Sequence, residues 1–258
     1  MDLNLQNRTA LVTGSHRGTG QIIAKALLAE GAQVLVHGFE PGQAEASVSE
    51  IGGGIAFTAD LCNDAARGPL AELCQAYNID ILVNNYGTAT PGRWQDSSSD
   101  GWSLAYQHNL MSAVRCIEAA LPGMQARGWG RIINLGTVGS TSPNARMPQY
   151  YSAKGALAAM NASLAKELAG TGVRVNLVSP GLIATPEVIA AYIAKGKKAG
   201  WGETWEAVEP HVAKDIPIGR ITRREEVADL VSFLASTRSD AIHGQNIRID
   251  GGQLGIVQ

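Results

Sequence analysis

Two residues in one short stretch of the chain, Tyr150 and Lys154 in "YYSAK", could together carry out proton transfer. Their spacing of four places both side chains on one face of a helix. A free phenol has a pKa of about 10, and a nearby ammonium favours the phenolate and lowers that pKa toward neutrality. Tyr151 has no lysine at this spacing. The pattern therefore predicts Tyr150 as a general acid/base and Lys154 as the residue that lowers its pKa.

A second stretch with chemical meaning is "TGSHRGTG", residues 13–20, which runs from one predicted strand straight into a predicted helix. Its three glycines allow a tight turn and close approach of the backbone to a pyrophosphate, whose charge a helix N-terminus stabilises. In this position a glycine-rich turn is typical of dinucleotide binding. The residues predicted to bind the cofactor here are Gly14, Ser15, His16, Arg17, Gly18, Thr19 and Gly20.

The elements that must position these residues alternate between short apolar runs and helical stretches. Seven runs are apolar almost throughout, which is typical of parallel strands covered on both faces: TALVTG, QVLVHG, GIAFTAD, IDILVNN, GRIINLG, VRVNLVSPG and NIRIDGG. The pattern predicts an α/β fold of the doubly wound Rossmann type, with a mostly parallel seven-stranded sheet in a single domain over residues 1–258. Residues 186–215 interrupt the alternation and are expected to form a substrate lid or two helices packed on the sheet edge.

The composition narrows the class of function. A formal charge of -2 over 258 residues provides no general field that attracts nucleic acid or an anionic membrane. The N-terminus lacks a basic segment followed by a long apolar run, so a cytoplasmic protein without a membrane anchor is expected. Cys62, Cys74 and Cys116 stand far apart, and no metal site is predicted. The five histidines (His16, His37, His108, His211 and His243) lack a recognisable catalytic spacing and are not assigned as bases.

The glycine turn resembles the TGxxxGxG of the short-chain dehydrogenases/reductases. The resemblance extends along almost the whole chain in family order, through Asp60-Leu61, "NNYG" at 84–87, "HNL" at 108–110, "YYSAK" at 150–154, "SPGLIAT" at 179–185 and "IDGG" at 249–252. It implies an oxidoreductase that moves a hydride between a nicotinamide and a carbonyl/secondary alcohol pair. The nearest likeness is to 3-oxoacyl-acyl-carrier-protein reductases and to sugar or secondary-alcohol dehydrogenases.

The resemblance also implies catalytic roles. The family's serine lies thirteen residues before the tyrosine, where this chain has Thr137, whose hydroxyl still suits a donor to the substrate oxygen. Ser140 and Ser142 are rivals for that role. Asn109 matches the asparagine that holds a proton-relay water in the family, and Lys154 would also bind the nicotinamide ribose.

Further positions are assigned to the cofactor by the same register. Asp60 and Leu61 would contact the adenine, Asn84 and Gly87 the ribose path, and the carboxamide would bind at Pro180, Gly181, Ile183 and Thr185. Gly38 stands where NAD-preferring relatives carry an aspartate, and Arg17 stands where NADP users place a basic residue. NADP(H) is therefore expected over NAD(H), although Phe39 and Glu40 do not add to a phosphate site.

The substrate is expected to be a small carbonyl or alcohol compound, in a pocket made largely from residues 86–96, 140–149 and 186–215. Tyr86 replaces the family's usual alanine, and its role stays open. Carrier-protein docking is in doubt because only Arg127 matches the arginines used for it. The alternatives are an NAD-dependent sugar or alcohol dehydrogenase, and a cofactor-binding regulator with little catalysis. The resemblance also implies a homotetramer.

Overall fold

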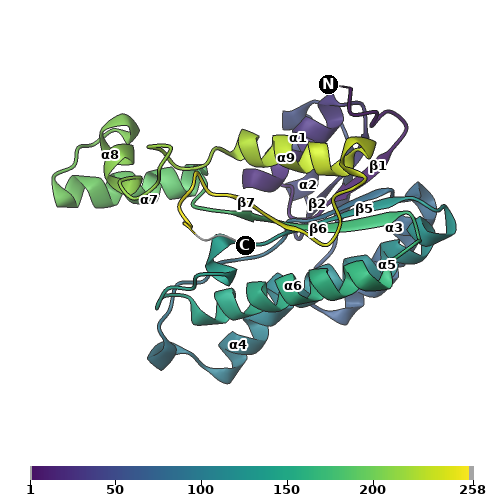
Figure 1. The fold of residues 1–258 in the computed structure, drawn as a ribbon, viewed down its shortest axis with the longest axis horizontal. Helices are drawn as coiled ribbons and strands as arrows, with labels where there is room; N and C mark the ends of the chain where they lie inside the picture. The colour runs from purple at the N-terminus through teal and green to yellow at the C-terminus, as the bar shows by residue number, and fades with distance from the viewer. Residues whose placement is uncertain (1, 256–258) are drawn as a thin grey trace.

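The computed structural model describes residues 2–255, and within them a seven-stranded sheet forms the centre of the molecule (Figure 1). Every pair of neighbouring strands is parallel, and the strand order is β3-β2-β1-β4-β5-β6-β7. The strands are β1 (Thr9–Val12), β2 (Gln33–Gly38), β3 (Ile55–Thr58), β4 (Ile81–Asn84), β5 (Gly130–Leu135), β6 (Val173–Pro180) and β7 (Asn246–Ile249). This architecture confirms the predicted doubly wound α/β fold.

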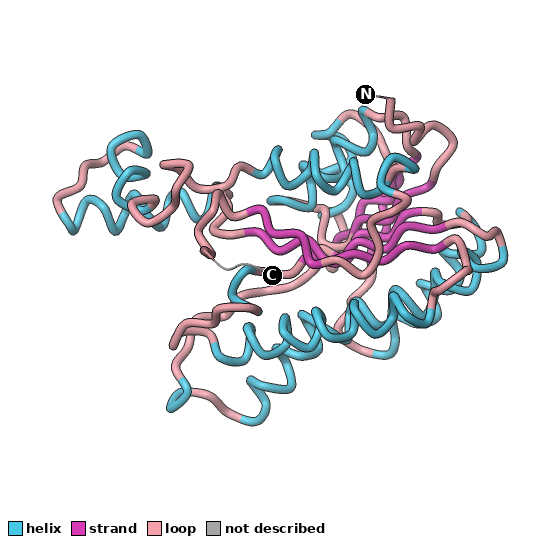
Figure 2. The backbone as a smooth tube through the Cα atoms, in the orientation of Figure 1, coloured by secondary structure: helices cyan, strands magenta, loops and turns pink. Residues whose placement is uncertain are grey.

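Helices cover both faces of the sheet, as the parallel connections between strands require (Figure 2). Helices α1 (Gly18–Ala29), α2 (Gln43–Ile51) and α9 (Arg224–Ala235) lie on one face. The opposite face carries α3 (Arg67–Tyr77), α4 (Ser99–Tyr106), α5 (Ser112–Ala126) and α6 (Pro148–Glu167). Between α4 and α5 the chain makes a π-helical turn, η3 (Gln107–Met111). Single 3-10 turns occur at η1 (Asp64–Ala66), η2 (Trp94–Asp96), η4 (Val138–Ser140) and η5 (Thr237–Ser239).

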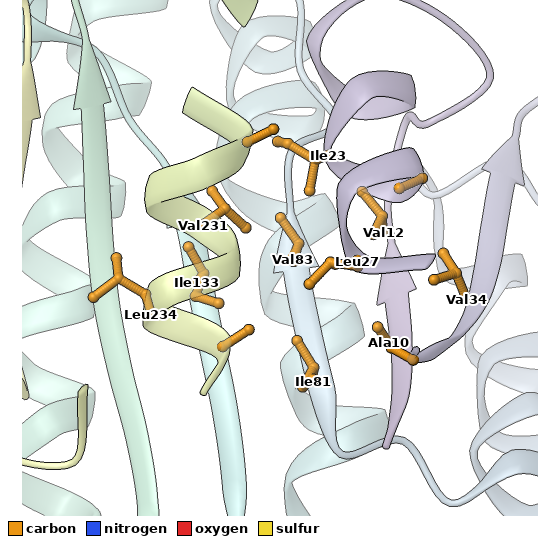
Figure 3. Packing of buried hydrophobic residues seen from close by; sticks show 14 of the residues in the cluster. Ala10, Val12, Ile23, Leu27, Val34, Ile81, Val83, Ile133, Val231 and Leu234 are labelled. Carbon is orange, nitrogen blue, oxygen red and sulfur yellow. The ribbon is translucent and has the colours of Figure 1, made fainter. Parts of the chain in front are cut away.

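The strands bury both of their faces, which explains why they are apolar almost throughout. In β1, Ala10 and Val12 pack beneath α1 and α9, whereas Leu11 packs against the helices of the opposite face. The alternation follows from the strand period of two. Figure 3 shows the first of these cores, where Ile23 and Leu27 of α1 lie over the sheet beside α9.

Residues 186–215 form α7 (Pro186–Ala199) and α8 (Trp205–Val212), which project away from the sheet (Figure 1). The two helices share a small apolar cluster of their own, in which Ala213 and Ile216 are buried with Trp205 packed against them. The segment is thus a projecting helical pair and not two helices packed along the sheet edge, and its role as a substrate lid stays a prediction.

Strand order reverses between β1 and β4, because the chain first builds outward from β1 to β3 and then returns to the other side of β1. In open parallel sheets a ligand binds at the carboxyl ends of the strands at such a switch point. The glycine turn follows β1 and the "NNYG" segment follows β4, so both predicted cofactor segments meet there.

Candidate active site

The glycine turn at residues 14–20 is shaped by conformations that only glycine adopts readily. Gly14 and Gly18 have φ values of +61° and +64°. A Cβ on Gly20 would lie 2.4 Å from Asn85 Nδ2 and 2.5 Å from the Gly14 carbonyl oxygen, so no side chain fits there. The turn leads into the N-terminus of α1, where unpaired backbone N–H groups favour an anion. These features fit the pyrophosphate of a dinucleotide.

His37, which the sequence left without a role, fixes this turn to the rest of the sheet. Its Nδ1 accepts from the Gly14 backbone N–H at 2.9 Å, and its Nε2 lies 2.9 Å from the Ala59 carbonyl oxygen. Burial lowers the pKa of His37 to about 4, so the ring is neutral and can accept and donate at once. His37 is therefore a positioning residue for the cofactor turn. Its place at the end of β2, beside the glycine turn, was the available signal.

Ser15 is also used internally. Its hydroxyl donates to the Val12 carbonyl oxygen at 2.6 Å and accepts from the His37 backbone N–H at 2.8 Å. The side chain is fully buried. Ser15 therefore holds the turn in shape, and its hydroxyl is not presented to a cofactor as the sequence led us to expect.

After β4 the structure corrects the assignment by one residue. Asn84 is buried within the sheet, where its Nδ2 donates to Asn134 Oδ1 at 2.9 Å. The neighbouring Asn85 lines the cavity instead, and its Nδ2 donates to the carbonyl oxygens of Thr13 and Gly14 at 2.9 and 3.1 Å. Consecutive side chains along an extended chain point to opposite sides. A shift of one residue therefore moves the side chain from the interior of the sheet, where Asn84 lies, to the cavity, where Asn85 lies.

Helix α6 brings Tyr150 and Lys154 together on one face, as their spacing predicts. Lys154 is 4% exposed, and its Nζ donates to the carbonyl oxygen of Leu135, the last residue of β5, at 2.7 Å. Gly87 lies against Lys154 and Asn109, since a Cβ there would be 3.3 Å from Lys154 Nζ and 2.6 Å from Asn109 Oδ1. The absence of a side chain at Gly87 leaves the lysine accessible from the cavity.

Thr137 is the hydroxyl residue that acts on Tyr150, since its side chain lowers the pKa of the Tyr150 phenol. Its Oγ1 also accepts from the Gly139 backbone N–H at 3.2 Å, which fixes its orientation. The hydroxyl of Ser140 instead donates to the Thr137 carbonyl oxygen at 2.7 Å, and Ser142 is exposed. The geometry thus favours Thr137 over both serines. Tyr151 turns away and accepts from Asn144 Nδ2 at 3.0 Å.

Asn109 lies in the π-helical turn, buried beneath Gly87. Its Oδ1 accepts from the Thr88 backbone N–H at 3.1 Å, and its Nδ2 donates to the carbonyl oxygens of Thr88 and Ala105, both at 3.0 Å. The amide is therefore occupied in holding the segment after β4, and one acceptor position on Oδ1 remains for a relaying water. Single π-helical turns of this kind occur frequently at functional sites.

The pKa values of the pair differ from the expectation. The pKa of Tyr150 is raised to about 12, mainly by burial and also by the nearby Tyr151, while Thr137 acts in the opposite direction. Burial lowers the pKa of Lys154 to about 8. Loss of hydration therefore outweighs the attraction between ammonium and phenolate that the sequence suggested. In this state the phenol holds its proton at neutral pH, which suits a proton donor.

These residues surround a cavity of about 210 Å³. The lining contains Thr19 from the glycine turn, Gly87, Asn109, Tyr150, Lys154, Pro180 and Ile183. The other members of the predicted carboxamide segment lie beside it: Gly181 packs against Asp250, and Thr185 accepts from the Val188 N–H to cap α7. None of residues 186–215 lines the cavity, so the expected contribution of the lid is not formed in this structure.

The adenine end of the site is only partly as expected. Leu61 is 1% exposed and packs in the core, so its side chain cannot face a cofactor. Asp60 holds its own loop, accepting from the Cys62 backbone N–H at 3.0 Å. Tyr86 points to this end of the site, where its Oη lies 3.1 Å from Cys62 Sγ and its ring meets those of Phe39 and His108 edge-on. Tyr86 thus lies between the segment predicted to contact the adenine and His108 of the π-helical turn.

The residues relevant to cofactor choice lie at the rim. Arg17 is 68% exposed and reaches Glu187 of α7, with Nη1 to Oε1 at 3.5 Å. A Cβ on Gly38 would lie 2.8 Å from Gln43 Cβ and 3.0 Å from the Ala44 nitrogen, so the start of α2 leaves no room for an aspartate. Glu40 accepts from Gln43 Nε2 at 3.2 Å. An exposed basic side chain, paired only with an exposed carboxylate at the rim, and the missing acid at Gly38 both suit a 2'-phosphate.

Two other observations bear on partners. No helix within residues 2–255 has the length and apolar character needed to span a bilayer. Arg127, which matched one carrier-protein docking position, is held by Asp80 at 3.3 Å and donates to the Ile79 carbonyl oxygen at 2.6 Å. It is therefore not free to bind an acidic partner without breaking these contacts.

Comparison with known proteins agrees with this geometry. Residues 14–253 match the family model described as Enoyl-(Acyl carrier protein) reductase. The chain is 34% identical to D-beta-hydroxybutyrate dehydrogenase of Cupriavidus necator, covering 96% of this chain and 98% of that one. It is 31% identical to the 3-oxoacyl-acyl-carrier-protein reductase FabG of Escherichia coli, covering 97% and 98%.

Among solved structures, L-sorbose reductase from Gluconobacter frateurii, complexed with NADPH and L-sorbose, superposes with a TM-score of 0.91 at 29% identity over the full length of both chains. An NADP-bound 3-oxoacyl (acyl-carrier-protein) reductase from Agrobacterium tumefaciens superposes with a TM-score of 0.86 at 32% identity, covering 97% of this chain and 95% of that one. The protein therefore belongs to the short-chain dehydrogenase/reductase family and is an oxidoreductase.

Proposed function

We propose that this protein is an NADPH-dependent reductase that converts the carbonyl group of a small molecule to a secondary alcohol. The observation that carries the proposal is that Tyr150 and Lys154 line one cavity together with Thr19 of the glycine turn. Thr137 interacts with Tyr150 at the edge of this cavity. When bound, the reduced nicotinamide supplies the hydride that the carbonyl carbon receives.

The side chains of the protein then provide orientation and a proton. Thr137 donates a hydrogen bond to the carbonyl oxygen, which stabilises the negative charge that develops there. Tyr150 gives its phenolic proton to the same oxygen, and its raised pKa keeps that proton in place until the substrate binds. Lys154, buried below Gly87, is placed to bind the ribose and to stabilise the phenolate left after transfer.

Support for NADP(H) over NAD(H) comes from the exposed Arg17, from the steric exclusion of an acid at Gly38, and from the NADPH and NADP named in two similar structures. The glycine turn, Thr19, Asn85 and Gly87 would hold the pyrophosphate and ribose, and Pro180, Gly181 and Ile183 the carboxamide. Asn109 would hold the relaying water at its remaining acceptor position. An NAD-dependent sugar or alcohol dehydrogenase is the alternative.

The assembly and cellular location remain expectations from family membership. A homotetramer in the cytoplasm is proposed, with a small-molecule substrate and no nucleic-acid or membrane partner. Light scattering on the purified protein measures the mass of the assembly directly, and a monomer would contradict the first of these expectations.

The decisive experiment replaces the proton donor. Tyr150→Phe keeps the ring and removes only the hydroxyl, so carbonyl reduction followed by NADPH consumption should fall by about 10²- to 10⁴-fold. Tyr151→Phe is the matched control, since its hydroxyl contacts Asn144 outside the site and its loss should change the rate little. If Tyr150→Phe reduced carbonyl compounds as well as the wild type, the proposed mechanism would be wrong. An NADH preference in the wild type would overturn the cofactor assignment.

A further inference from the structure

A second cavity, of about 230 Å³, lies directly beside the first and shares Tyr150 and Thr88 with it. Its walls come from the segment after β4, from α4 and from the first turn of α6, a region that the cofactor assignment does not use. The lining residues are Thr88, Thr90, Pro91, Gly92, Asp96, Ser97, Ser98, Gly101, Leu104, Ala105, His108, Gln149 and Tyr150. A molecule in this cavity can therefore place one end at the Tyr150 hydroxyl while the rest lies outside the cofactor cavity.

The walls of this cavity are held in place by contacts that do not use its central polar groups. The Met147 backbone N–H donates to the Gly92 carbonyl oxygen at 2.8 Å, which ties the segment after β4 to the start of α6. Ser98 caps α4 by accepting from the Gly101 N–H at 3.1 Å. The cavity is thus part of the folded structure and does not depend on the lid.

Gln149 is the most informative of the lining residues. Its amide lies between two glycines, since a Cβ on Gly101 would be 3.0 Å from Gln149 Nε2 and a Cβ on Gly92 would be 3.9 Å from Gln149 Oε1. Within residues 2–255 this amide has no hydrogen-bond partner, and neither do the hydroxyls of Thr88 and Thr90. These donors and acceptors are available to a ligand that brings several hydroxyl groups.

The charged residues that line the cavity indicate which polar ligands it can bind. Asp96 contributes a carboxylate, and among the described residues no lysine or arginine lines the cavity. Burial lowers the pKa of His108, so its ring is neutral at physiological pH. A carboxylate or phosphate on the ligand would meet a negative charge and no cation. A long apolar chain would leave the amide and hydroxyls without partners.

We propose that this second cavity is a subsite for the hydroxyl-bearing chain of an uncharged polyhydroxylated ketone, whose carbonyl group lies at Tyr150 and Thr137. The assignment rests on the proposed reductase function and adds the class of substrate to it. Gln149 is the specificity-determining residue, which donates to and accepts from hydroxyl groups of the chain. Asp96 accepts from a further hydroxyl and excludes ketones that carry a carboxylate.

The test compares four substrate classes with NADPH: uncharged ketohexoses, keto-aldonates, an acetoacetyl thioester and a small diketone without hydroxyl groups. The wild type should have its highest kcat/KM with a ketohexose. Reduction of the diketone but of no ketohexose, or a higher kcat/KM with the keto-aldonate or thioester, overturns the substrate assignment and leaves the reductase function intact. No reduction of any of them with NADPH or NADH contradicts the reductase function itself.

Variants locate the preference in the cavity. Gln149→Leu keeps the side-chain length and removes both hydrogen-bonding groups, so the ratio of kcat/KM for ketohexose to that for diketone should fall about tenfold, mainly through KM. Gln75→Leu on α3, an exposed glutamine lining neither cavity, is the matched control and should leave that ratio unchanged. Asp96→Asn should raise kcat/KM for the keto-aldonate relative to the ketohexose. Unchanged ratios in both cavity variants would show that the chain binds elsewhere.

Discussion

Replacement of Lys154 by methionine should remove activity and at the same time stabilise the fold. The lysine is 4% exposed, and burial lowers its pKa from the ordinary value of 10.5 to about 8. Each pKa unit corresponds to about 1.4 kcal/mol, so keeping the ammonium charged in the folded protein at pH 7 costs about 3 kcal/mol. Loss of the hydrogen bond to the Leu135 carbonyl oxygen offsets about 1 kcal/mol of this. The variant should therefore unfold with a free energy about 2 kcal/mol above the wild type.

The pH dependence of this difference is the sharper readout. Because the pKa is lower in the folded than in the unfolded chain, the unfolded chain binds more protons between about pH 8 and pH 10.5. The free energy of unfolding of the wild type should therefore increase as the pH rises from about 8 to 10.5, because Lys154 then loses its charge. The methionine variant has no titrating group at this position and should not show the increase. The advantage of the variant should shrink by about 2 kcal/mol between pH 7 and pH 9.5.

Urea unfolding followed by tryptophan fluorescence at both pH values measures these differences, at one fixed protein concentration because subunit association adds to stability. Lys166→Met, on the exposed side of the same helix, is the matched control and should show no pH-dependent difference of this size. Carbonyl reduction by Lys154→Met should fall at least about 100-fold. A variant that is less stable than the wild type by the same amount at both pH values would refute the argument from burial.

Three further outcomes are expected. Thr137→Val should lower kcat/KM for reduction about 100-fold because it removes the hydroxyl proposed to donate to the substrate oxygen, whereas Thr137→Ser should stay within about tenfold of the wild type. Equal losses in the two variants would contradict the role of the hydroxyl. In the wild type, kcat/KM for reduction should be constant near neutral pH and should fall above about pH 8, because Lys154 then loses its proton. A profile that stays constant up to pH 10 would argue against a role for the charged Lys154 in the reaction. Gly38→Asp should destabilise the protein by about 1–3 kcal/mol, because the new side chain would clash with Gln43 and with the Ala44 backbone. The urea concentration at the midpoint of unfolding measures this loss. A variant as stable as the wild type would mean that α2 moves aside.

Much of the site could be predicted because its signals are local in the chain. The spacing of Tyr150 and Lys154 needs only a helix, and α6 provides it. The glycine turn needs only a strand before it and a helix after it, and β1 and α1 provide these. The seven apolar runs became seven parallel strands, since strands buried on both faces have little room for polar residues.

Other features depend on contacts between residues far apart in the sequence. His37 binds Gly14 and Ala59 only because β2 lies between β1 and β3 in the sheet. The choice between Asn84 and Asn85 depends on where β4 ends, which propensity resolves only to within a few residues. The second cavity forms where the segment after β4 meets the start of α6, within residues that the sequence analysis had assigned to the substrate pocket. Its shape and the position of Gln149 in it depend on how these segments pack, which no pattern within either segment reveals.

The amino-acid sequence by itself therefore determined the family and the sheet and singled out Tyr150 as the proposed proton donor, because periodicity and spacing act over a few residues. Only the tertiary structure decided the electrostatic state of that tyrosine. Burial raises the pKa of the Tyr150 phenol and lowers the pKa of Lys154, and the extent of burial is set by helices and loops packed from across the chain. The same packing turns the Ser140 hydroxyl to the Thr137 carbonyl oxygen and leaves Gln149 beside Tyr150 in the second cavity.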